Sequence, residues 1–188
     1  MSEKEIFDIV DEQGIPTGKT AVRAIAHEKG ILHRTAHVWV IRRNGPEIQV
    51  LLQRRSAVKD SWPLCLDTSS AGHILTGDEP KESALRELAE ELGIQAEPED
   101  LKEAGTFRIC FREMFHGRLF YDNEIAFLYV YDKPVKTEDL VLQEEEVIEA
   151  VWMDLAEAES RIEDGDPEIC ADLKSVRLLR KYLNEHPS

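Results

Sequence analysis

The sequence predicts an α+β fold in which a mixed β-sheet lies between layers of α-helices. Strand-like runs of alternating, β-branched residues come first, an amphipathic helix that ends at Leu92 interrupts them, and more strands and then helices follow. A sheet covered by helices is the arrangement that buries the apolar side of each such element. With 188 residues and 42% hydrophobic residues, the chain is expected to form a single domain over residues 1–188.

The first half of the chain is predicted to consist mainly of strands. Residues 6–10 form the first strand, and glycine and proline punctuate a turn over 11–18. Residues 21–28 are compatible with either a helix or an extended segment. Alternating runs over 37–42 and 48–54 follow, and the Asn44-Gly45-Pro46 sequence between them is a hairpin signal.

The second half is predicted to contain three more strands and two helices after them. Strand patterns cover 104–111 and 123–131, with a hairpin tip at 114–117, and a third lies around Ala150–Met153. A helix is expected after this last strand. Asp166 and Pro167 are an N-cap and a first-turn proline, and they predict the start of the final helix. Its apolar stripe is expected to contain Ile169, Leu173, Val176 and Leu183.

Residues 72–94 concentrate acidic side chains on one helix. Glu87, Glu90 and Glu91 occupy positions i, i+3 and i+4, so they share one face, apart from the apolar stripe of Leu85, Leu88 and Leu92. Like charges at this spacing weaken a helix by roughly 0.2–0.5 kcal/mol. A divalent cation that takes carboxylate oxygens, such as Mg²⁺ or Mn²⁺, would neutralise them. A solvated acidic surface is the alternative for these residues taken alone.

The loop before this helix completes a longer signature, from Gly72 through Asp78 and Arg86-Glu87-Leu88 to Glu90-Glu91 and Gly93-Ile94. The spacing resembles the Nudix box, with Asp78 where that family usually has glutamate. The resemblance implies the Nudix fold, a helix–sheet–helix sandwich. It also implies that the protein cleaves a diphosphate linked to another moiety, using water activated by Mg²⁺ or Mn²⁺.

The same resemblance implies metal ligands. Glu87 and Glu91 would bind the ion directly and Glu90 directly or through water, and the Gly72 carbonyl is a further candidate. Arg86 would orient Glu87 through a charge-assisted hydrogen bond.

Two of the implied catalytic roles have alternatives. Arg86 could instead form only a surface ion pair with Glu82 or Glu90. The general base varies in position within the family, and Glu124, in the strand pattern over 123–131, is the first candidate. An ordinary glutamate at a strand edge is the alternative for Glu124.

The flanks of the box resemble the branch of the family that contains isopentenyl-diphosphate isomerase, with Leu52-Gln53-Arg54-Arg55-Ser56, Lys59, Trp62-Pro63 and Gly72-His73. This resemblance implies that Arg54, Arg55, Lys59 and His73 bind the substrate. The alternative for the three basic residues is that they offset neighbouring acids. His37, His73 and Glu124 fall where the isomerases place metal or active-site residues.

Ala71 opposes an isomerase function. The isomerases place a protonating cysteine immediately before Gly-His, and alanine cannot donate a proton. Cys65 lies six residues earlier and is expected to be a structural thiol. His27 and His33 do not match the spacing of the isomerases' second metal histidine. Together with His37 they are interpreted as hydrogen-bonded polar residues rather than as zinc ligands.

Composition limits the partners and the cellular location. A net charge of −15 argues against nucleic acid and anionic membranes as main partners, and no apolar run is long enough to span a membrane. Three scattered cysteines and an N-terminus without a signal-peptide pattern favour the cytoplasm. A homodimer is an expectation from the family only.

Three functions remain open. A metal-dependent diphosphate hydrolase, acting on a nucleoside diphosphate linked to a further moiety or on a related organic diphosphate, is favoured because the box is nearly complete. The alternatives are isopentenyl-diphosphate isomerase and a non-catalytic diphosphate-binding module. The densest aromatic stretch contains Phe107, Phe111, Phe115, Phe120 and Tyr121, of which one or two could contact the rest of the substrate.

Overall fold

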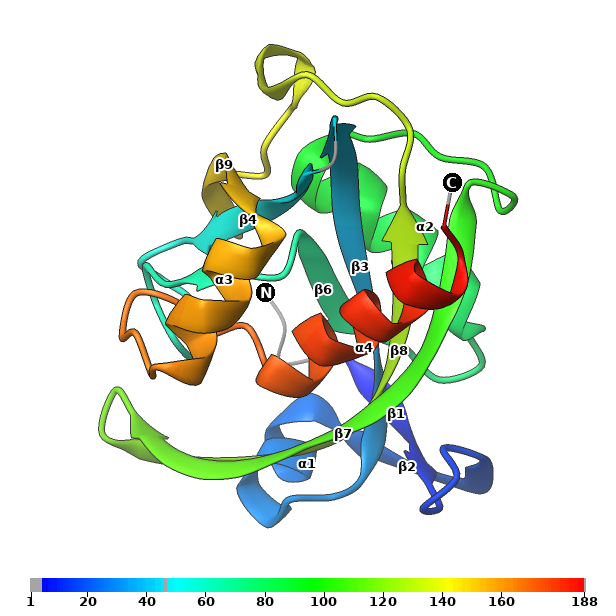
Figure 1. Cartoon of the computed structure of the whole chain (residues 1–188). Coiled ribbons are helices and arrows are strands. Elements are labelled where there is room, and N and C mark those ends of the chain that lie inside the picture. The colour runs from blue at the N-terminus through cyan, green and yellow to red at the C-terminus, as the bar shows by residue number, and fades with distance from the viewer. Residues whose placement is uncertain (1–4, 46, 188) are drawn as a thin grey trace.

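The chain folds around a mixed seven-stranded sheet with a separate two-stranded ribbon, β1–β2, beside it (Figure 1). The computed structural model describes residues 5–45 and 47–187, so Pro46 of the predicted hairpin lies outside the described residues. The elements in chain order are β1 (Ile6–Val10), β2 (Pro16–Val22), α1 (Arg23–Lys29), β3 (His33–Asn44), β4 (Glu47–Arg55), β5 (Leu66–Asp67), β6 (Ser70–His73), α2 (Pro80–Leu92), β7 (Leu101–Phe115), β8 (Arg118–Tyr131), the 3₁₀ turn η2 (Thr137–Asp139), β9 (Val147–Asp154), α3 (Leu155–Glu163) and α4 (Leu173–Glu185).

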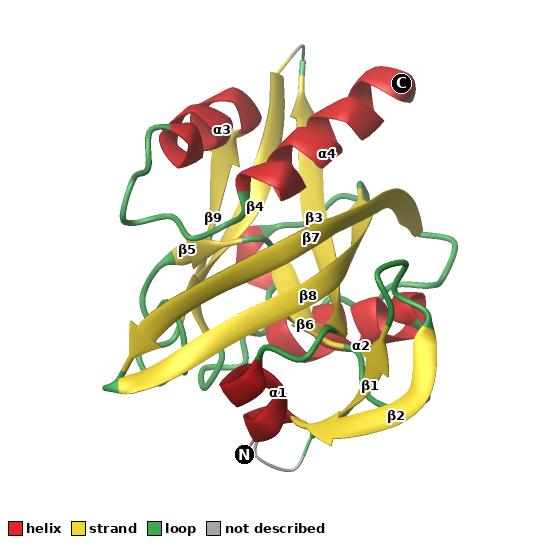
Figure 2. Cartoon of the chain, turned by 90° about the horizontal axis from the view of Figure 1, so that it is seen from below, coloured by secondary structure: helices red, strands yellow, loops and turns green. Residues whose placement is uncertain are grey.

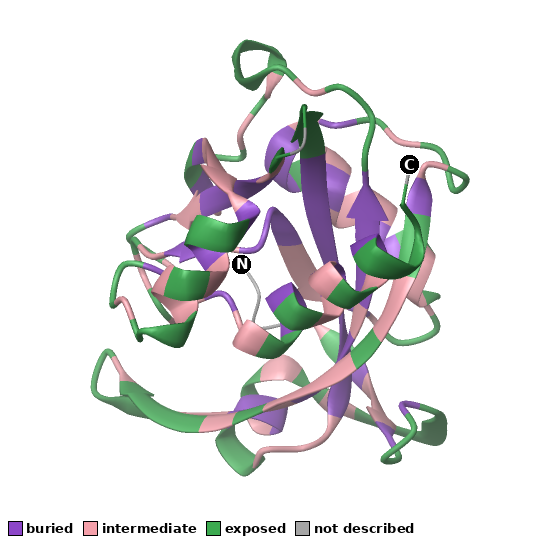
Figure 3. Cartoon of the chain, in the orientation of Figure 1, coloured by how far each residue is buried: buried purple, intermediate pink, exposed green. Residues whose placement is uncertain are grey.

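The predicted α+β sandwich is confirmed. The main sheet has the order β5-β4-β3-β8-β7, with β6 paired to β3 and β9 paired to β4. Alternate residues of β3 enter two different cores, because successive side chains of a strand point to opposite faces. Val38 packs in the core that contains residues of α2, whereas Trp39 packs in the core that contains residues of α3 and α4. Figure 3 shows most of β3 buried between these layers.

The strand predictions are confirmed, and most strands are longer than predicted. β7 and β8 form one long curved hairpin that sweeps across the molecule (Figure 2). Its tip at His116 and Gly117 has left-handed backbone angles, with φ of 50° and 75°. The segment over 21–28 contains both predicted alternatives, since β2 runs to Val22 and α1 begins at Arg23. The turn predicted over 11–18 is shorter, because β2 already begins at Pro16.

Local signals explain where α2 begins and ends. Pro80 occupies the first turn, where its missing N–H costs nothing, and Gly93 ends the helix with a left-handed φ of 72°. Leu88 and Leu92 are fully buried. The apolar stripe therefore anchors α2 to the sheet and leaves the glutamate-bearing side for another role.

The final helix begins later than predicted. α4 starts at Leu173, with Asp172 as the N-cap that accepts a hydrogen bond from Lys174 N at 2.7 Å. Residues after Pro167 bond instead to β5, since Leu66 N donates to the Glu168 carbonyl and Cys170 N donates to the Leu66 carbonyl. Ile169 is buried in this connection and not on the helix. The rest of the predicted stripe lies on α4.

A buried hydrogen bond ties β3 to α4. Trp39 Nε1 donates to Ser175 Oγ at 2.8 Å, and both residues have no exposed surface. Replacing Ser175 by alanine leaves the indole N–H without an acceptor, so we expect the free energy of unfolding to fall by about 1–3 kcal/mol. Urea denaturation measures this change. The matched control is Ser160→Ala on the exposed side of α3, for which a change within about 0.5 kcal/mol is expected.

Among the residues that the structure describes, no helix is both long and apolar enough to cross a membrane.

Candidate functional site

Two carboxylates of α2 turn inward toward β6. Glu91 is only 3% exposed, and its Oε2 accepts hydrogen bonds from Ala71 N at 3.1 Å and Gln53 Nε2 at 3.4 Å. Glu87 lies directly over Gly72, where a Cβ atom would come within 2.5 Å of Glu87 Oε2. Gly72 thus makes room for a carboxylate at the start of the box. Glu90, by contrast, is exposed on the outer side of the helix.

Arg86 joins the box loop to Glu87. Its Nη1 donates to Asp78 Oδ2 at 2.6 Å, and its Nη2 donates to Glu87 Oε1 and to the His73 carbonyl, both at 3.1 Å. Three acceptors on a planar guanidinium fix the direction in which Glu87 points. The aspartate at position 78 therefore forms the contact that holds Arg86, although its side chain is shorter than the glutamate usual there.

Burial places these carboxylates where they need a positive partner. Burial, and then the charge of Glu87, raises the pKa of Glu91 to about 8. Burial also raises the pKa of Glu87, against the lowering effect of Arg86. Two buried carboxylates with raised pKa values are a donor set that a hard divalent cation would stabilise. The residues therefore fit the metal expected at the box.

A second group of donors lies beside the box, on α1, β3, β6 and β8. Four residues each offer one possible metal-binding atom, and these atoms lie within 4.8 Å of one another: His27, His33, His73 and Glu124. We call these four residues the histidine group. The parallel pairing of β3 with β8 places His33 opposite Glu124. Nε2 atoms of His33 and His73 are each 3.5 Å from Glu124 Oε1. Thr35 Oγ1 donates to Glu124 Oε2 at 3.0 Å, which fixes the carboxylate.

Hydrogen bonds set which imidazole nitrogens are free. Nδ1 of His27 and Nδ1 of His33 face the carbonyls of Arg23 and Ile31, at 3.1 and 2.8 Å, so these nitrogens carry the protons. Their Nε2 atoms therefore present lone pairs to the group, and among the described residues the buried Nε2 of His33 has no hydrogen-bond partner. His73 differs, because its Nδ1 accepts from Arg23 Nη1 at 3.0 Å.

Burial disfavours the charged form of two histidines of this group. Burial and the neighbouring His33 lower the pKa of His27 to about 4, and burial with Arg23 lowers the pKa of His73 well below its usual value. Burial alone would raise the pKa of Glu124, but a hydrogen bond and the positive charge from the imidazolium form of His33 lower it to about 2. Neutral imidazoles and an ionised carboxylate are the forms that bind transition-metal ions. Asp122, two residues before Glu124 on the same strand, lies 3.7 Å from His27 Nε2.

The structure adds to the sequence interpretation of the histidines. His27 and His33, interpreted as hydrogen-bonded polar residues, do form hydrogen bonds through Nδ1. They also lie beside His73 and Glu124, whereas His37 lies outside that group. His37 packs edge-on against Phe107, and its buried Nδ1 has no partner among the described residues. Sequence reasoning also missed Asp122. The signal available for it was the Asp-x-Glu spacing, which puts both carboxylates on one face of a strand.

The three basic residues before the box divide into two sets. Arg54 turns to the neighbouring strand β9 and donates to Glu149 at 2.7 Å. Arg55 pairs with Asp67 at 3.0 Å, and Lys59 pairs with Glu146. The charge of Lys59 opposes the burial that raises the pKa of Glu91, so Lys59 lies within electrostatic reach of the box. Against the lowering effect of burial, the charges of Asp67 and, more weakly, Glu91 raise the pKa of Arg55. Arg55 and Lys59 therefore both lie near the box, whereas Arg54 pairs with β9.

The predicted aromatic stretch contacts the histidine group. Phe120 stacks on His27 with ring centroids 4.4 Å apart, and Phe111 stacks on Phe120 at 6.1 Å. Trp62 reaches the same stretch from the loop after β4, 5.1 Å from Phe115. Trp62 has a left-handed φ of 47°, a strained value for a residue other than glycine. These rings form an apolar wall beside the donors.

Comparison with known proteins gives consistent results. The NUDIX domain family model matches residues 31–173. A protein of Clostridium acetobutylicum named as an uncharacterized Nudix hydrolase is 38% identical over 155 residues, covering 82% of this chain and 72% of that protein. An isopentenyl-diphosphate Delta-isomerase of Dinoroseobacter shibae is 32% identical over 171 residues, covering 91% and 86%. The crystal structure of DR0079 from Deinococcus radiodurans shares the fold, with a TM-score of 0.69 at 18% identity and coverage of 94% and 98%.

Proposed function

The chain belongs to the Nudix hydrolase superfamily, since the family model covers residues 31–173, and from this premise we propose that it hydrolyses the diphosphate linkage of a small organic diphosphate with a divalent cation. The observation that carries the proposal is the pair of inward-facing carboxylates Glu87 and Glu91, one of them seated over Gly72. The proposed substrates are nucleoside diphosphates linked to a further moiety, or related diphosphates.

Each box residue has a distinct part in this proposal. Glu87 and Glu91 hold the cation, and the Gly72 carbonyl is a further ligand. Arg86 keeps Glu87 directed at the site through its bonds to Asp78 and Glu87. When bound, a divalent cation screens the phosphate charges and lowers the pKa of a bound water. Glu90 is exposed, so its contact with the ion would pass through water.

Other residues are proposed to hold the substrate. Lys59 and Arg55 release Glu146 and Asp67 to bind the phosphate oxygens, a role for which arginine's planar fork is well suited. Trp62 and Phe120 contact the moiety beyond the diphosphate. These positions favour a substrate that lies between the loop after β4 and the β7–β8 hairpin.

The histidine group fits a second cation. Within the described part of the chain, His33 already presents a free Nε2, whereas His27 Nε2 accepts from His73 Nε2 at 3.3 Å. His27 and His73 would complete the donor set once Arg23 no longer donates to His73 Nδ1. Such a cation would add positive charge that helps to neutralise a diphosphate. Glu124 then serves as a ligand and not as the general base, a change from the role that the sequence suggested.

Isomerisation of isopentenyl diphosphate is the second candidate, because the histidine group occurs together with an isomerase among the relatives. Ala71 stands against it, since no proton donor occupies that position. Cys65 does not replace it, because its thiol donates to the Pro167 carbonyl at 3.5 Å in the connection between α3 and α4.

A product screen separates these functions. The protein is incubated with Mg²⁺ or Mn²⁺ and a panel of nucleoside diphosphate sugars, dinucleoside polyphosphates and isopentenyl diphosphate in deuterated water. Phosphorus NMR detects cleavage, and mass spectrometry detects deuterium in an isomerised product. Metal-dependent cleavage without deuterium incorporation supports the hydrolase. Deuterated isomer without cleavage supports the isomerase, and binding without either reaction supports a non-catalytic module.

Replacing His33 by glutamine tests the second cation. The variant is expected to lose the Mn²⁺ of the histidine group while it keeps the ion of the box, because only one of the two donor sets has changed. Electron paramagnetic resonance during Mn²⁺ titration counts the bound ions. His186→Gln on the exposed C-terminal segment is the control, and its Mn²⁺ binding should equal that of the wild type. Equal binding by His33→Gln would show that the group holds no ion.

A further inference from the structure

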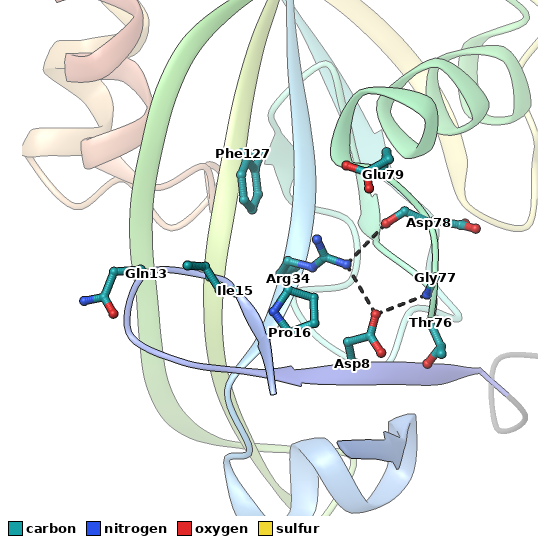
Figure 4. A pocket seen from close by; sticks show the side chains of 11 residues that line it. Asp8, Gln13, Ile15, Pro16, Arg34, Thr76, Gly77, Asp78, Glu79 and Phe127 are labelled. Atoms are coloured by element: carbon teal, nitrogen blue, oxygen red, sulfur yellow. Dashed lines mark hydrogen bonds and ion pairs between the residues drawn. The ribbon is translucent and has the colours of Figure 1, made fainter. Parts of the chain in front are cut away.

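A separate cavity of about 550 Å³ lies under the loop that leads into α2 (Figure 4). Three parts of the chain line it: the β1–β2 ribbon, the inner strands β3 and β8, and the box loop over residues 76–79. Its volume is in the range of small-molecule sites. The cavity shares Asp78 with the box, but the histidine group and the basic residues Arg55 and Lys59 do not line it.

Arg34 at the base of this cavity has unmet hydrogen-bonding capacity. The residue is 7% exposed, and its Nη2 donates to Asp8 Oδ2 at 3.4 Å and to the Asp78 carbonyl at 3.2 Å. Both distances are long for a charge-assisted hydrogen bond. Its buried Nε has no partner among the described residues. A guanidinium that is buried and only partly paired calls for a further acceptor.

The rest of the lining supplies negative charge and an apolar surface. Figure 4 shows Asp8 and Glu79 on opposite sides of the Arg34 guanidinium, while the Asp78 side chain turns away to its pairing with Arg86. Ile15, Pro16 and Phe127 line the cavity as well and give it an apolar surface (Figure 4). The carboxylates disfavour a phosphate, because they outnumber the one guanidinium.

We infer that this cavity binds a free α-amino acid with an apolar side chain. The ligand's carboxylate accepts from Arg34, its ammonium donates to Glu79 and Asp8, and its side chain packs on Ile15 and Phe127. A zwitterion meets each of the three features, whereas an amine or a carboxylic acid meets only two. The assignment does not depend on which diphosphate the box cleaves.

The cavity is connected to the box by a short chain of contacts. Arg34 bonds to the Asp78 carbonyl, the Asp78 side chain bonds to Arg86, and Arg86 bonds to Glu87. An acceptor that draws Arg34 toward the ligand changes the position of Asp78. Occupancy is therefore expected to change the turnover rate at the box, which makes the cavity a regulatory site.

Binding is tested on the unmodified protein with three compounds of one shape. L-Leucine carries both charges, isocaproate lacks the ammonium, and isoamylamine lacks the carboxylate. Isothermal titration calorimetry, with saturation-transfer NMR for weak binding, is expected to give a Kd for leucine at least about 10-fold below that of either analogue. Inorganic phosphate should not compete. Absence of saturable leucine binding up to about 10 mM would overturn the inference.

Two variants locate the binding. Glu79→Gln removes the ammonium partner, and Arg34→Lys keeps the charge but loses the second donor of the fork. Each should weaken leucine binding by about 10-fold, whereas Glu82→Gln, exposed in the first turn of α2, should not. Unchanged binding in both cavity variants would place leucine elsewhere. Because calorimetry needs no turnover, these results stand even if the proposed hydrolysis fails. A leucine-dependent change in kcat tests the regulation separately.

Discussion

Glu91→Gln is expected to lose metal-dependent turnover, with a fall in kcat of at least about 100-fold, since even residues that only orient a metal ligand contribute about 10- to 100-fold. Glutamine keeps an oxygen that can accept from Ala71 N, the bond that Glu91 Oε2 accepts at 3.1 Å. It removes the negative charge that a hard cation requires. Initial rates measured against Mg²⁺ concentration give kcat and the apparent metal affinity.

Controls separate this loss from unfolding. Glu91 is buried and burial raises its pKa to about 8, so a neutral amide of the same shape is an inexpensive replacement in the metal-free protein. The melting temperature in EDTA should therefore stay at or above that of the wild type. Glu82→Gln on the exposed side of the same helix should keep full turnover. If Glu91→Gln keeps the wild-type kcat, the glutamates of the box do not bind a metal that turnover requires.

The parts of the fold that were predictable depend on neighbours in the sequence. Pro80, the leucine stripe and Gly93 determine α2 within a single segment, and the structure places its ends where these signals lie. The hairpin tip at His116-Gly117 is likewise local, because glycine tolerates the positive φ found there. Nothing distant is needed for either feature.

The histidine group depends on pairings that a sequence pattern does not specify. His33 faces Glu124 because β3 and β8 run parallel, and parallel strands are joined by crossovers whose register no turn fixes. His27 arrives from α1, a short helix without a clear periodic signal. Spacing along the chain therefore did not group these two histidines with Glu124, whereas it grouped Glu87 with Glu91, because both lie on one helix.

Arg54 and Arg55 show a second reason why the prediction of site residues from the sequence was incomplete. Arg54 and Arg55 both looked suited to phosphate binding, but adjacent residues of a strand point to opposite faces. Arg54 meets Glu149 of β9, and Arg55 meets Asp67 of β5. The alternation was visible in the sequence, and applying it would have left only one of the pair as a candidate.

The start of α4 shows how tertiary contacts can override a local signal. Asp166 and Asp172 are both suitable N-caps, and Pro167 favours the first. The backbone bonds from residues 168 and 170 to Leu66 hold the intervening chain against β5 in a non-helical form. The second aspartate therefore caps the helix.

Gly72→Ala is expected to lower metal-dependent kcat by about 100-fold, because misplacing a reacting group by about 1 Å costs that much. The backbone of Gly72 is not in the left-handed region, so alanine brings no conformational strain at this position. Its methyl group would lie 2.5 Å from Glu87 Oε2 and 2.6 Å from Cγ, which forces the carboxylate away from the site. Mn²⁺ affinity at the box should fall together with kcat.

A second glycine of the box loop provides the matched comparison for this variant. A methyl group at Gly77 would meet open space, but the backbone φ there is +83°, so Gly77→Ala is strained without touching Glu87. We expect Gly77→Ala to lose about 1 kcal/mol of stability and to keep its turnover. We expect Gly72→Ala to keep its stability and to lose turnover. If both variants instead lose activity in proportion to stability, Gly72 acts through the backbone of the loop. The reaction would then not require the space that Gly72 leaves for the Glu87 carboxylate.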